Sequence, residues 1–333
     1  MKHVVVQSDL HESDIRPAKL LSRFREISIE ESRCFFGDPA GLVDVDCPAC
    51  AAKEKSEVFD KDGFHYLQCA ECGSVYVSPR PSADQLGDYY CHSRAAQYRA
   101  EHLSQATEQA RRVHILRSNV SWLGWILEEA GSSRSGRYAD LGTNYPVIFE
   151  EIGRLHLFDE LFSIGPLEGV AEACREAGAE VSGGPVDDLC ALSAFEQLEH
   201  QFSPFDYLHS AREMLSPGGM IFATTRTISG FDLRVLWDKA PYIYVPEHLN
   251  LMSIEGIGRL YERLGFEVVE LSTPGQLDVE FVQRAAELDP SIRLPNFIDY
   301  LLHQRDRRAL ADFQEFLQKH RLSSHVRVAG KKE

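Results

Sequence analysis

Four of the eight cysteines fall in two closely spaced pairs. Two residues separate Cys47 from Cys50 and two separate Cys69 from Cys72, with about eighteen residues between the pairs. A turn of this length lets two thiolates converge on one ion, and two such turns supply the four soft ligands of a closed tetrahedral site. Because four thiolates leave no position open for a substrate, we expect a structural Zn²⁺ ion.

Two other interpretations of the cysteine pairs stay open. One is a redox-active pair, which would be expected inside a strand–helix–strand pattern that this segment lacks. The other is four unconnected thiols. The residues between the pairs favour a zinc ribbon, because Asp62 and Gly63 form a hairpin turn signal with strand-like flanks. Gly73 follows the second pair, where a positive φ helps the chain leave a tight turn.

Apolar strand patterns alternate with helical patterns from residue 137 to about 277, which predicts an α/β fold with a mostly parallel sheet. Helical patterns follow over 280–322, and 325–332 is expected to form a final edge strand. The run at 137–152 reads as strand, tight turn and helix. In an α/β sheet, such a turn makes a nucleotide pocket at the carboxyl edge.

The chain divides into four parts by these patterns. Residues 1–35 form a polar, helix-rich extension, 36–80 the zinc ribbon, and 81–135 a helical linker or lid. Residues 136–333 form the α/β domain, with an insertion at 226–255 on the substrate side and C-terminal helices.

Three runs, at 137–152, 195–200 and 215–225, resemble in their order the class I S-adenosylmethionine-dependent methyltransferases. The cysteine pairs, PEHLNLMS at 246–253 and TPGQLDV at 273–279 resemble a subgroup with an N-terminal zinc ribbon, found among deoxysugar and natural-product C-methyltransferases. The resemblance implies a Rossmann-like, mostly parallel sheet with an antiparallel edge strand. It also implies S-adenosylmethionine as cofactor and a sugar or natural-product intermediate as substrate.

The resemblance places the cofactor beside the first and fourth strands of the sheet. Asp140, Gly142 and Asn144 belong to the first loop, and Phe195 and Glu196 follow the fourth strand. Two features depart from the family pattern. Asn144 and Pro146 stand where the family has glycines, and the second strand lacks the expected acid for the ribose hydroxyls. The sequence therefore leaves two functions open: a methyltransferase, or a pseudo-methyltransferase that binds a ligand or a partner protein.

The resemblance also implies a catalytic group in the insertion. Tyr244, Glu247 and His248 are the candidates, because related enzymes place a Tyr and a His–Glu pair here to deprotonate a carbon beside a carbonyl. Histidine suits proton transfer near neutral pH, and a tyrosine hydroxyl can stabilise the enolate. The alternative for His248 is a structural one, in which it caps the next helix or bonds to backbone.

The formal net charge of −16 disfavours nonspecific binding to nucleic acid or to anionic membranes, because the long-range field repels phosphate. No apolar run approaches the roughly twenty residues that cross a bilayer, and the N-terminus turns acidic too early for a signal peptide. We therefore expect a cytoplasmic protein whose partner is a small-molecule substrate or a protein of the same pathway.

Overall fold

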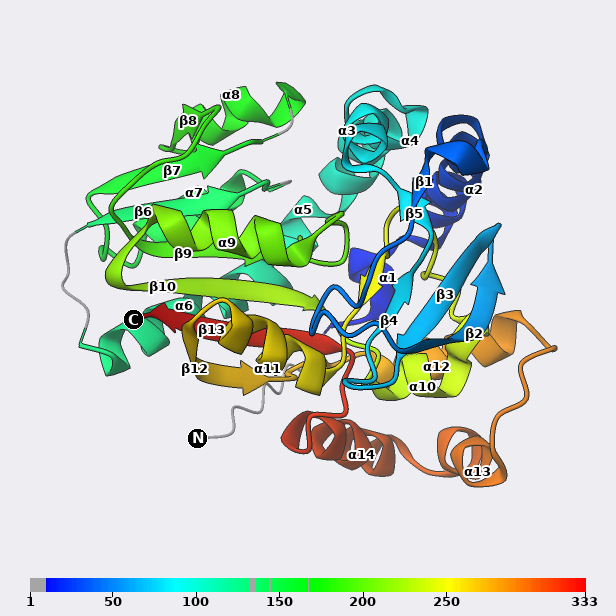
Figure 1. Ribbon diagram of the computed structural model, residues 1–333. Helices are drawn as coiled ribbons and strands as arrows, with labels where there is room; N and C mark the ends of the chain where they lie inside the picture. The colour runs from blue at the N-terminus through cyan, green and yellow to red at the C-terminus, as the bar shows by residue number, and fades with distance from the viewer. Residues whose placement is uncertain (1–9, 132–135, 144, 167) are drawn as a thin grey trace.

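The computed structural model describes residues 10–131, 136–143, 145–166 and 168–333. Within these residues the largest sheet has seven strands in the order β12-β13-β10-β9-β6-β7-β8 (Figure 1). Five neighbouring strands, β10 to β8 in that order, run parallel, and β13 runs antiparallel to both of its neighbours. The bounds are β6 Arg137–Leu141, β7 Glu160–Ile164, β8 Glu180–Ser182, β9 Leu189–Phe195, β10 Leu215–Arg226, β12 Phe266–Ser272 and β13 His325–Lys332.

The predicted α/β class with a mostly parallel sheet is confirmed, and two details differ from expectation. The antiparallel strand lies one place inside the edge, between β12 and β10. Because β12 and β10 each leave one row of backbone groups free, a strand of opposite direction can bond to both. Strand β8 was not predicted, since three residues are too few to show an alternating pattern.

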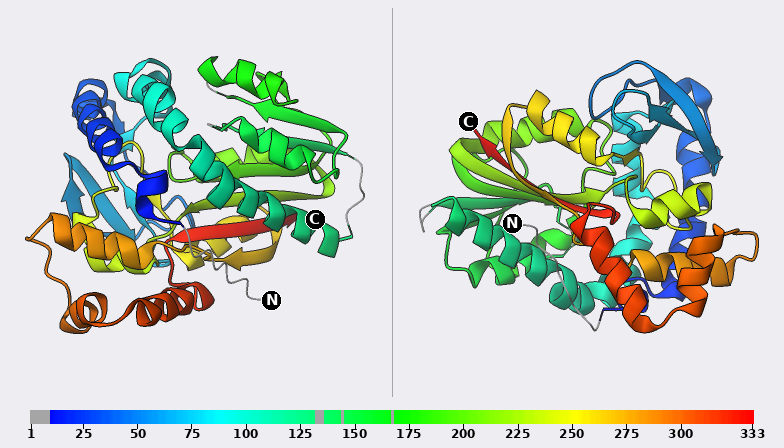
Figure 2. Two further views of the ribbon diagram at one scale, coloured as in Figure 1. Left: turned by 180° about the vertical axis from the view of Figure 1, so that it is seen from behind. Right: turned by 90° about the horizontal axis from the view of Figure 1, so that it is seen from below.

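Successive side chains of each strand point to opposite faces of the sheet, and both faces are covered. Tyr138 and Phe222 pack toward α6 (Arg117–Glu129), α7 (Val147–Gly153) and α8 (Glu168–Glu176). Ala139 and Ala223 pack toward α9 (Pro204–Met214) and α11 (Ile254–Arg263). Figure 2 shows the two helical layers from behind and from below.

Helix α3 (Ala83–His92) leads into a nearly continuous helix that crosses behind the sheet. That helix consists of α4 (Arg94–Tyr98), η2 (Arg99–Ser104), α5 (Gln105–Arg111), η3 (Arg112–Leu116) and α6. Both η2 and η3 are π-helical, a geometry that changes the direction of the following side chains and is frequent at functional sites.

The cysteine segment forms a second sheet in the order β11-β4-β3-β2. The predicted hairpin is present, with Asp62 and Gly63 at φ +53° and +94° between β2 (Lys55–Lys61) and β3 (Phe64–Cys69). Strand β4 (Val75–Val77) pairs with β11 (Asn250–Leu251), which comes from the insertion after β10. A two-stranded ribbon joins β1 (Leu42–Val43) to β5 (Arg80–Pro81). The cysteine segment therefore shares its sheet with the α/β domain.

The N-terminal helix α2 (Ala18–Phe36) lies beside α3 and α4, and the short α1 (Glu12–Ile15) contacts α5 (Figure 1). The remaining elements are η1 (Pro39–Gly41), α10 (Phe231–Leu236), η4 (Trp237–Lys239), α12 (Asp278–Leu288), α13 (Asn296–Gln304) and α14 (Arg307–Lys319). Among the described residues, every helix is too short or too polar to cross a membrane.

Candidate functional site

A cavity of about 170 Å³ lies at the carboxyl edge of the sheet, where β6, β9 and β10 end. The insertion, η2, α1 and α2 close it from the other side. Six of the residues singled out in the sequence line this one cavity: Asp140, Phe195, Glu196, Tyr244, Glu247 and His248. Asn144 lies outside the described residues.

The loop between β6 and α7 keeps one glycine of the expected family pattern, Gly142, and has Pro146 where the pattern has another. Gly142 adopts φ +66°, and its N–H donates to the Ile164 carbonyl at 3.0 Å. A Cβ on Gly142 would lie 3.0 Å from Gln197 Oε1, so the Gln197 side chain closely covers the loop. Pro146 has helical dihedrals and caps the start of α7, which is compatible with its fixed φ.

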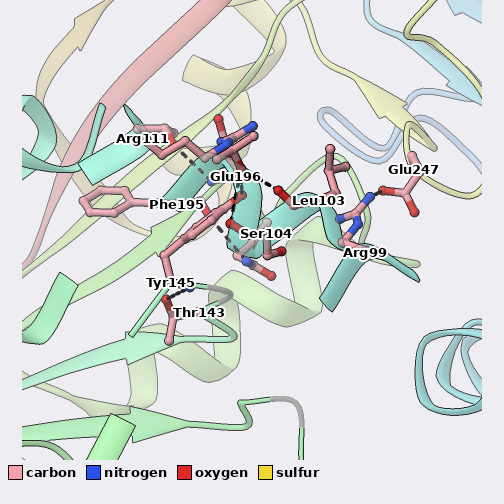
Figure 3. A network of polar contacts seen from close by, with 12 residues as sticks. Arg99, Leu103, Ser104, Arg111, Thr143, Tyr145, Phe195, Glu196 and Glu247 are labelled. Carbon is pink, nitrogen blue, oxygen red and sulfur yellow. Dashed lines mark hydrogen bonds and ion pairs between the residues drawn. The ribbon is translucent and has the colours of Figure 1, made fainter. Parts of the chain in front are cut away.

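An ion pair and an aromatic ring close the cavity beside this loop. Arg111 Nη1 lies 2.9 Å from Glu196 Oε2, and its guanidinium lies 5.2 Å from the centre of the Tyr145 ring. Figure 3 shows the three side chains directed toward one another. Burial by itself would raise the pKa of Glu196, but Arg111, together with His325 and His200, lowers that pKa overall. The pair therefore stays charged in this structure.

Asp140 is buried and accepts a hydrogen bond from the Ser193 hydroxyl. Burial raises the pKa of Asp140 to about 7. After β7 the chain continues with Gly165 and Pro166, so no acid directly follows that strand. Among the described residues that line the cavity, none comes from 160–188. The residues thus fit the part of a cofactor near β6 and β9, and lack the ribose acceptor expected at β7.

Two histidines and a tyrosine form one wall of the cavity. The His248 ring centre lies 6.0 Å from that of Tyr244 and 6.2 Å from that of His200. Within the described residues, Nδ1 of both histidines is buried and has no hydrogen-bond partner. Burial, followed by nearby arginines, lowers the pKa of His200 to about 3 and that of His248 well below its usual value. Burial raises the pKa of Tyr244 to about 12. At neutral pH both imidazoles are uncharged and the hydroxyl is protonated.

The carboxylate of Glu247, a predicted catalytic candidate, is not free to act as a base. Its buried carboxylate forms an ion pair with Arg99, and its Oε2 lies 3.9 Å from His200 Nδ1. Glu247 therefore holds Arg99 at the cavity wall.

His248 does not cap the next helix, because the Ser253 hydroxyl does so by accepting from the Gly256 N–H at 2.8 Å.

Arg99 and Arg111 were not among the predicted site residues, although both line the cavity. Arg99 begins η2 and Arg111 directly precedes η3, so the π-helical turns help to set their directions. Arg111 belongs to an ARR run at 110–112, but nothing local in that run shows that its side chain faces a cavity.

The four cysteines of the two pairs come together as expected. Their sulfur atoms all lie within 4.8 Å of one another, with Cys47 and Cys72 at 3.6 Å and Cys50 and Cys69 at 3.5 Å. A tetrahedral ion with metal–sulfur bonds of about 2.3 Å needs sulfur–sulfur separations of about 3.8 Å. The cluster can therefore hold a metal ion with small adjustments.

Residues 135–271 match the family model described as a methyltransferase domain. This stretch contains the strand ends and the insertion that line the cavity. A comparison with curated protein sequences finds no match.

Several solved structures are similar to this chain. The cyclase SpnF is 14% identical, with 64% of this chain and 80% of that chain covered and a TM-score of 0.41. Coclaurine N-methyltransferase, bound to N-methylheliamine and SAH, is 13% identical over 64% of this chain and 72% of that chain, with a TM-score of 0.40. The mycolic acid cyclopropane synthase CmaA1, complexed with SAH and CTAB, is 12% identical over 69% and 85%, with a TM-score of 0.42.

Proposed function

We propose that this chain transfers a methyl group from S-adenosylmethionine to a small molecule in the cavity at the carboxyl edge. One observation carries the proposal: Asp140 and Glu196 at the strand ends line the same cavity as Tyr244 and His248 of the insertion. The match of residues 135–271 to a methyltransferase domain supports it. S-Adenosylmethionine supplies the methyl group as an electrophile, and the protein mainly aligns the acceptor with it.

The wall residues have distinct roles in this proposal. His248 accepts the proton from the acceptor through its uncharged, unpartnered Nδ1. The protonated Tyr244 hydroxyl donates to the oxygen on which negative charge develops. The ion pair of Arg99 and Glu247 keeps this wall in position. An acceptor with an acidic C–H or O–H, such as a sugar or natural-product intermediate of a cytoplasmic pathway, fits these groups.

The metal centre is proposed to be a structural Zn²⁺ site. Its four thiols leave no position for a substrate, and Cys47, Cys69 and Cys72 are buried. The ion would fix the ribbon against α11 and the insertion.

A second candidate is a pseudo-methyltransferase that binds a ligand or a pathway protein without transferring a group. The observation that favours it is the closure beside the first loop by Tyr145 and the pair of Arg111 and Glu196. The absence of an acid directly after β7 favours it as well.

Calorimetric titration of the metal-loaded protein with S-adenosylmethionine and S-adenosylhomocysteine decides between the two. Micromolar dissociation constants support the enzyme. Binding weaker than about 1 mM, or about −4 kcal/mol, supports the second candidate.

A further inference from the structure

A second cavity, of about 100 Å³, adjoins the first. Seven residues line both cavities: Ile15, Arg16, Arg111, Ile115, Asn119, Glu196 and Arg226. From that junction the second cavity extends to the segment after β12 and to the start of β13. It therefore lies on the opposite side of β6 from β7, where the family places the ribose acid.

Asn119, on α6, presents a donor to the junction. The side chain is buried, and its Oδ1 accepts hydrogen bonds from Arg327 Nε at 3.0 Å and Nη2 at 2.8 Å. Because the oxygen faces Arg327, the amide orientation is fixed. Within the described residues its Nδ2 is buried and has no hydrogen-bond partner.

Arg16 presents a positive charge from the N-terminal segment. Its guanidinium lies 4.7 Å from the Tyr242 ring centre and 4.3 Å from the Phe281 ring centre. Arg226 lies 4.5 Å from the same Tyr242 ring, but Asp232 pairs with it at 3.6 Å. Among the described residues, Nη1 of Arg16 is buried without a hydrogen-bond partner. Two guanidinium groups on the same rings repel each other, and an anion beside Arg16 would offset that repulsion.

Arg111 supplies the third donor. Its Nη1 bonds to Glu196, whereas its Nε is buried without a partner among the described residues. The unpartnered buried atoms of the second cavity's described lining are thus Arg16 Nη1, Arg111 Nε and Asn119 Nδ2, all of them donors. Buried donors without acceptors are costly and uncommon, so their convergence calls for a ligand with acceptor oxygens. Two of the three donors carry positive charge, which favours an anion.

We propose that Arg16, Arg111 and Asn119 bind an anionic group, a carboxylate or a phosphate, of the small-molecule acceptor. The assignment to a methyl acceptor rests on the proposed function, whereas the anion site itself does not. The position toward β13 favours the acceptor over the carboxylate of the cofactor's methionine as the source of the anion.

The test is calorimetric titration of the full-length, metal-loaded protein at low ionic strength with inorganic phosphate and with malonate, against potassium chloride as control. We expect saturable binding of at least one probe by the wild type. Asn119→Asp keeps the oxygen that holds Arg327 and replaces the donor by a negative acceptor, so binding should be lost. Arg16→Gln should weaken binding about tenfold or more, since charge-assisted hydrogen bonds are the strong ones.

Two matched variants serve as controls, Asn296→Asp on α13 and Arg23→Gln on α2, both at exposed positions. They should bind the probes as the wild type does. Circular dichroism establishes that each variant is folded. If Arg16→Gln does not fold, Asn119→Asp alone decides the outcome. The proposal is overturned if the wild type binds neither probe, or if folded Asn119→Asp binds them unchanged.

A repeat at saturating S-adenosylhomocysteine separates the two sources of the anion. An unchanged dissociation constant for the probe supports the acceptor, and competition overturns that assignment. If S-adenosylhomocysteine does not bind at all while phosphate or malonate does, the proposed methyl transfer fails and the anion site stands.

Discussion

Arg80 Nη1 donates a hydrogen bond of 2.9 Å to Asn250 Oδ1 across 170 positions of sequence. Arg80 is completely buried and also donates to the carbonyls of Val77 at 2.9 Å and Phe202 at 2.8 Å. Asn250 Nδ2 in turn donates to the Leu198 carbonyl at 3.0 Å. One arginine thus joins the ribbon, the loop after β9 and the insertion that carries His248.

Arg80→Met should destabilise the protein by about 3 kcal/mol, because it leaves several buried acceptors without a donor. Denaturant unfolding measures the change. Arg308→Met, at an exposed position on α14, is the control and should change stability by less than about 0.5 kcal/mol. Equal effects of the two substitutions would contradict the role given to Arg80.

Removal of the metal should loosen more than the ribbon itself. Strand β4 pairs with β11, and the Ser253 hydroxyl donates to the Cys72 carbonyl. Elemental analysis should find about one zinc per chain. Hydrogen exchange after chelation, or in Cys47→Ser, should then speed up at 249–253 as well as at 47–77, while β6 and β9 keep their protection. Cys34→Ser, at an exposed position, should leave exchange unchanged.

Tyr145→Ala should open the cavity beside the first loop. If the ring and the ion pair of Arg111 and Glu196 exclude the cofactor, the variant should bind S-adenosylhomocysteine at least about tenfold more tightly than the wild type, a gain of about 1.4 kcal/mol. Titration calorimetry measures it, with Tyr300→Ala on the exposed face of α13 as control. An unchanged affinity would show that Tyr145 does not block the site.

His248→Gln should abolish turnover while the affinity for S-adenosylhomocysteine changes little, because the lost proton acceptor acts in the transition state. Methyl transfer assays and calorimetry give the two readouts, and His303→Gln on the exposed side of α13 is the control. Full activity of His248→Gln would contradict this role and indicate His200 as the base. The Nδ1 of His200 is the other unpartnered imidazole nitrogen of the described cavity wall.

Glu199 should make stability fall as pH rises. Burial raises the pKa of its carboxyl to about 8, against an ordinary value of 4.5. Between these values the folded chain keeps a proton that the unfolded chain releases, so stability is highest below about pH 4.5 and decreases up to about pH 8. Below about pH 6.5 the buried histidines act in the opposite direction, since burial lowers the pKa of His200 to about 3.

Burial raises the pKa of Asp140 and that of Glu12 to about 7, so these carboxyls also lower stability up to about pH 7, and the window specific to Glu199 is about pH 7 to 8. Glu199→Gln should flatten the decrease of the unfolding free energy there, by at most about 1.4 kcal/mol per pH unit. Glu213→Gln, at an exposed position of α9, should retain the wild-type slope. An equally steep slope in Glu199→Gln would show that the carboxyl of Glu199 is already ionised in the folded chain.

The fold was predictable from the sequence because its signals are local. Alternating strand patterns, the Asp62–Gly63 turn and the strand–turn–helix around Gly142 each depend on a few neighbouring residues. The inner position of β13 was not predictable, because it depends on which backbone edges remain free after β10 and β12 are in place.

The sequence predicted the cavity residues at the strand ends and in the insertion, and it missed those that come from the helices. Arg111 and Asn119 reach the cavity through the direction of a helix interrupted by two π-helical turns, and no local pattern signals that direction. Arg16 reaches it through the packing of the N-terminal segment on Tyr242 and Phe281. The role of Glu247 changed for a similar reason, because the ion pair with Arg99 comes from a distant helix.

The inner position of β13 has a consequence for synthesis on the ribosome. The row of backbone groups that β10 offers to β13 stays unpaired until residues 325–332 have emerged, about a hundred residues after β10 itself. Exposed strand edges invite pairing with other chains, and contacts distant in sequence form slowly. The nascent protein therefore carries an unpaired sheet edge while the residues between β10 and β13 are made, and is a natural client for chaperones that shield such edges.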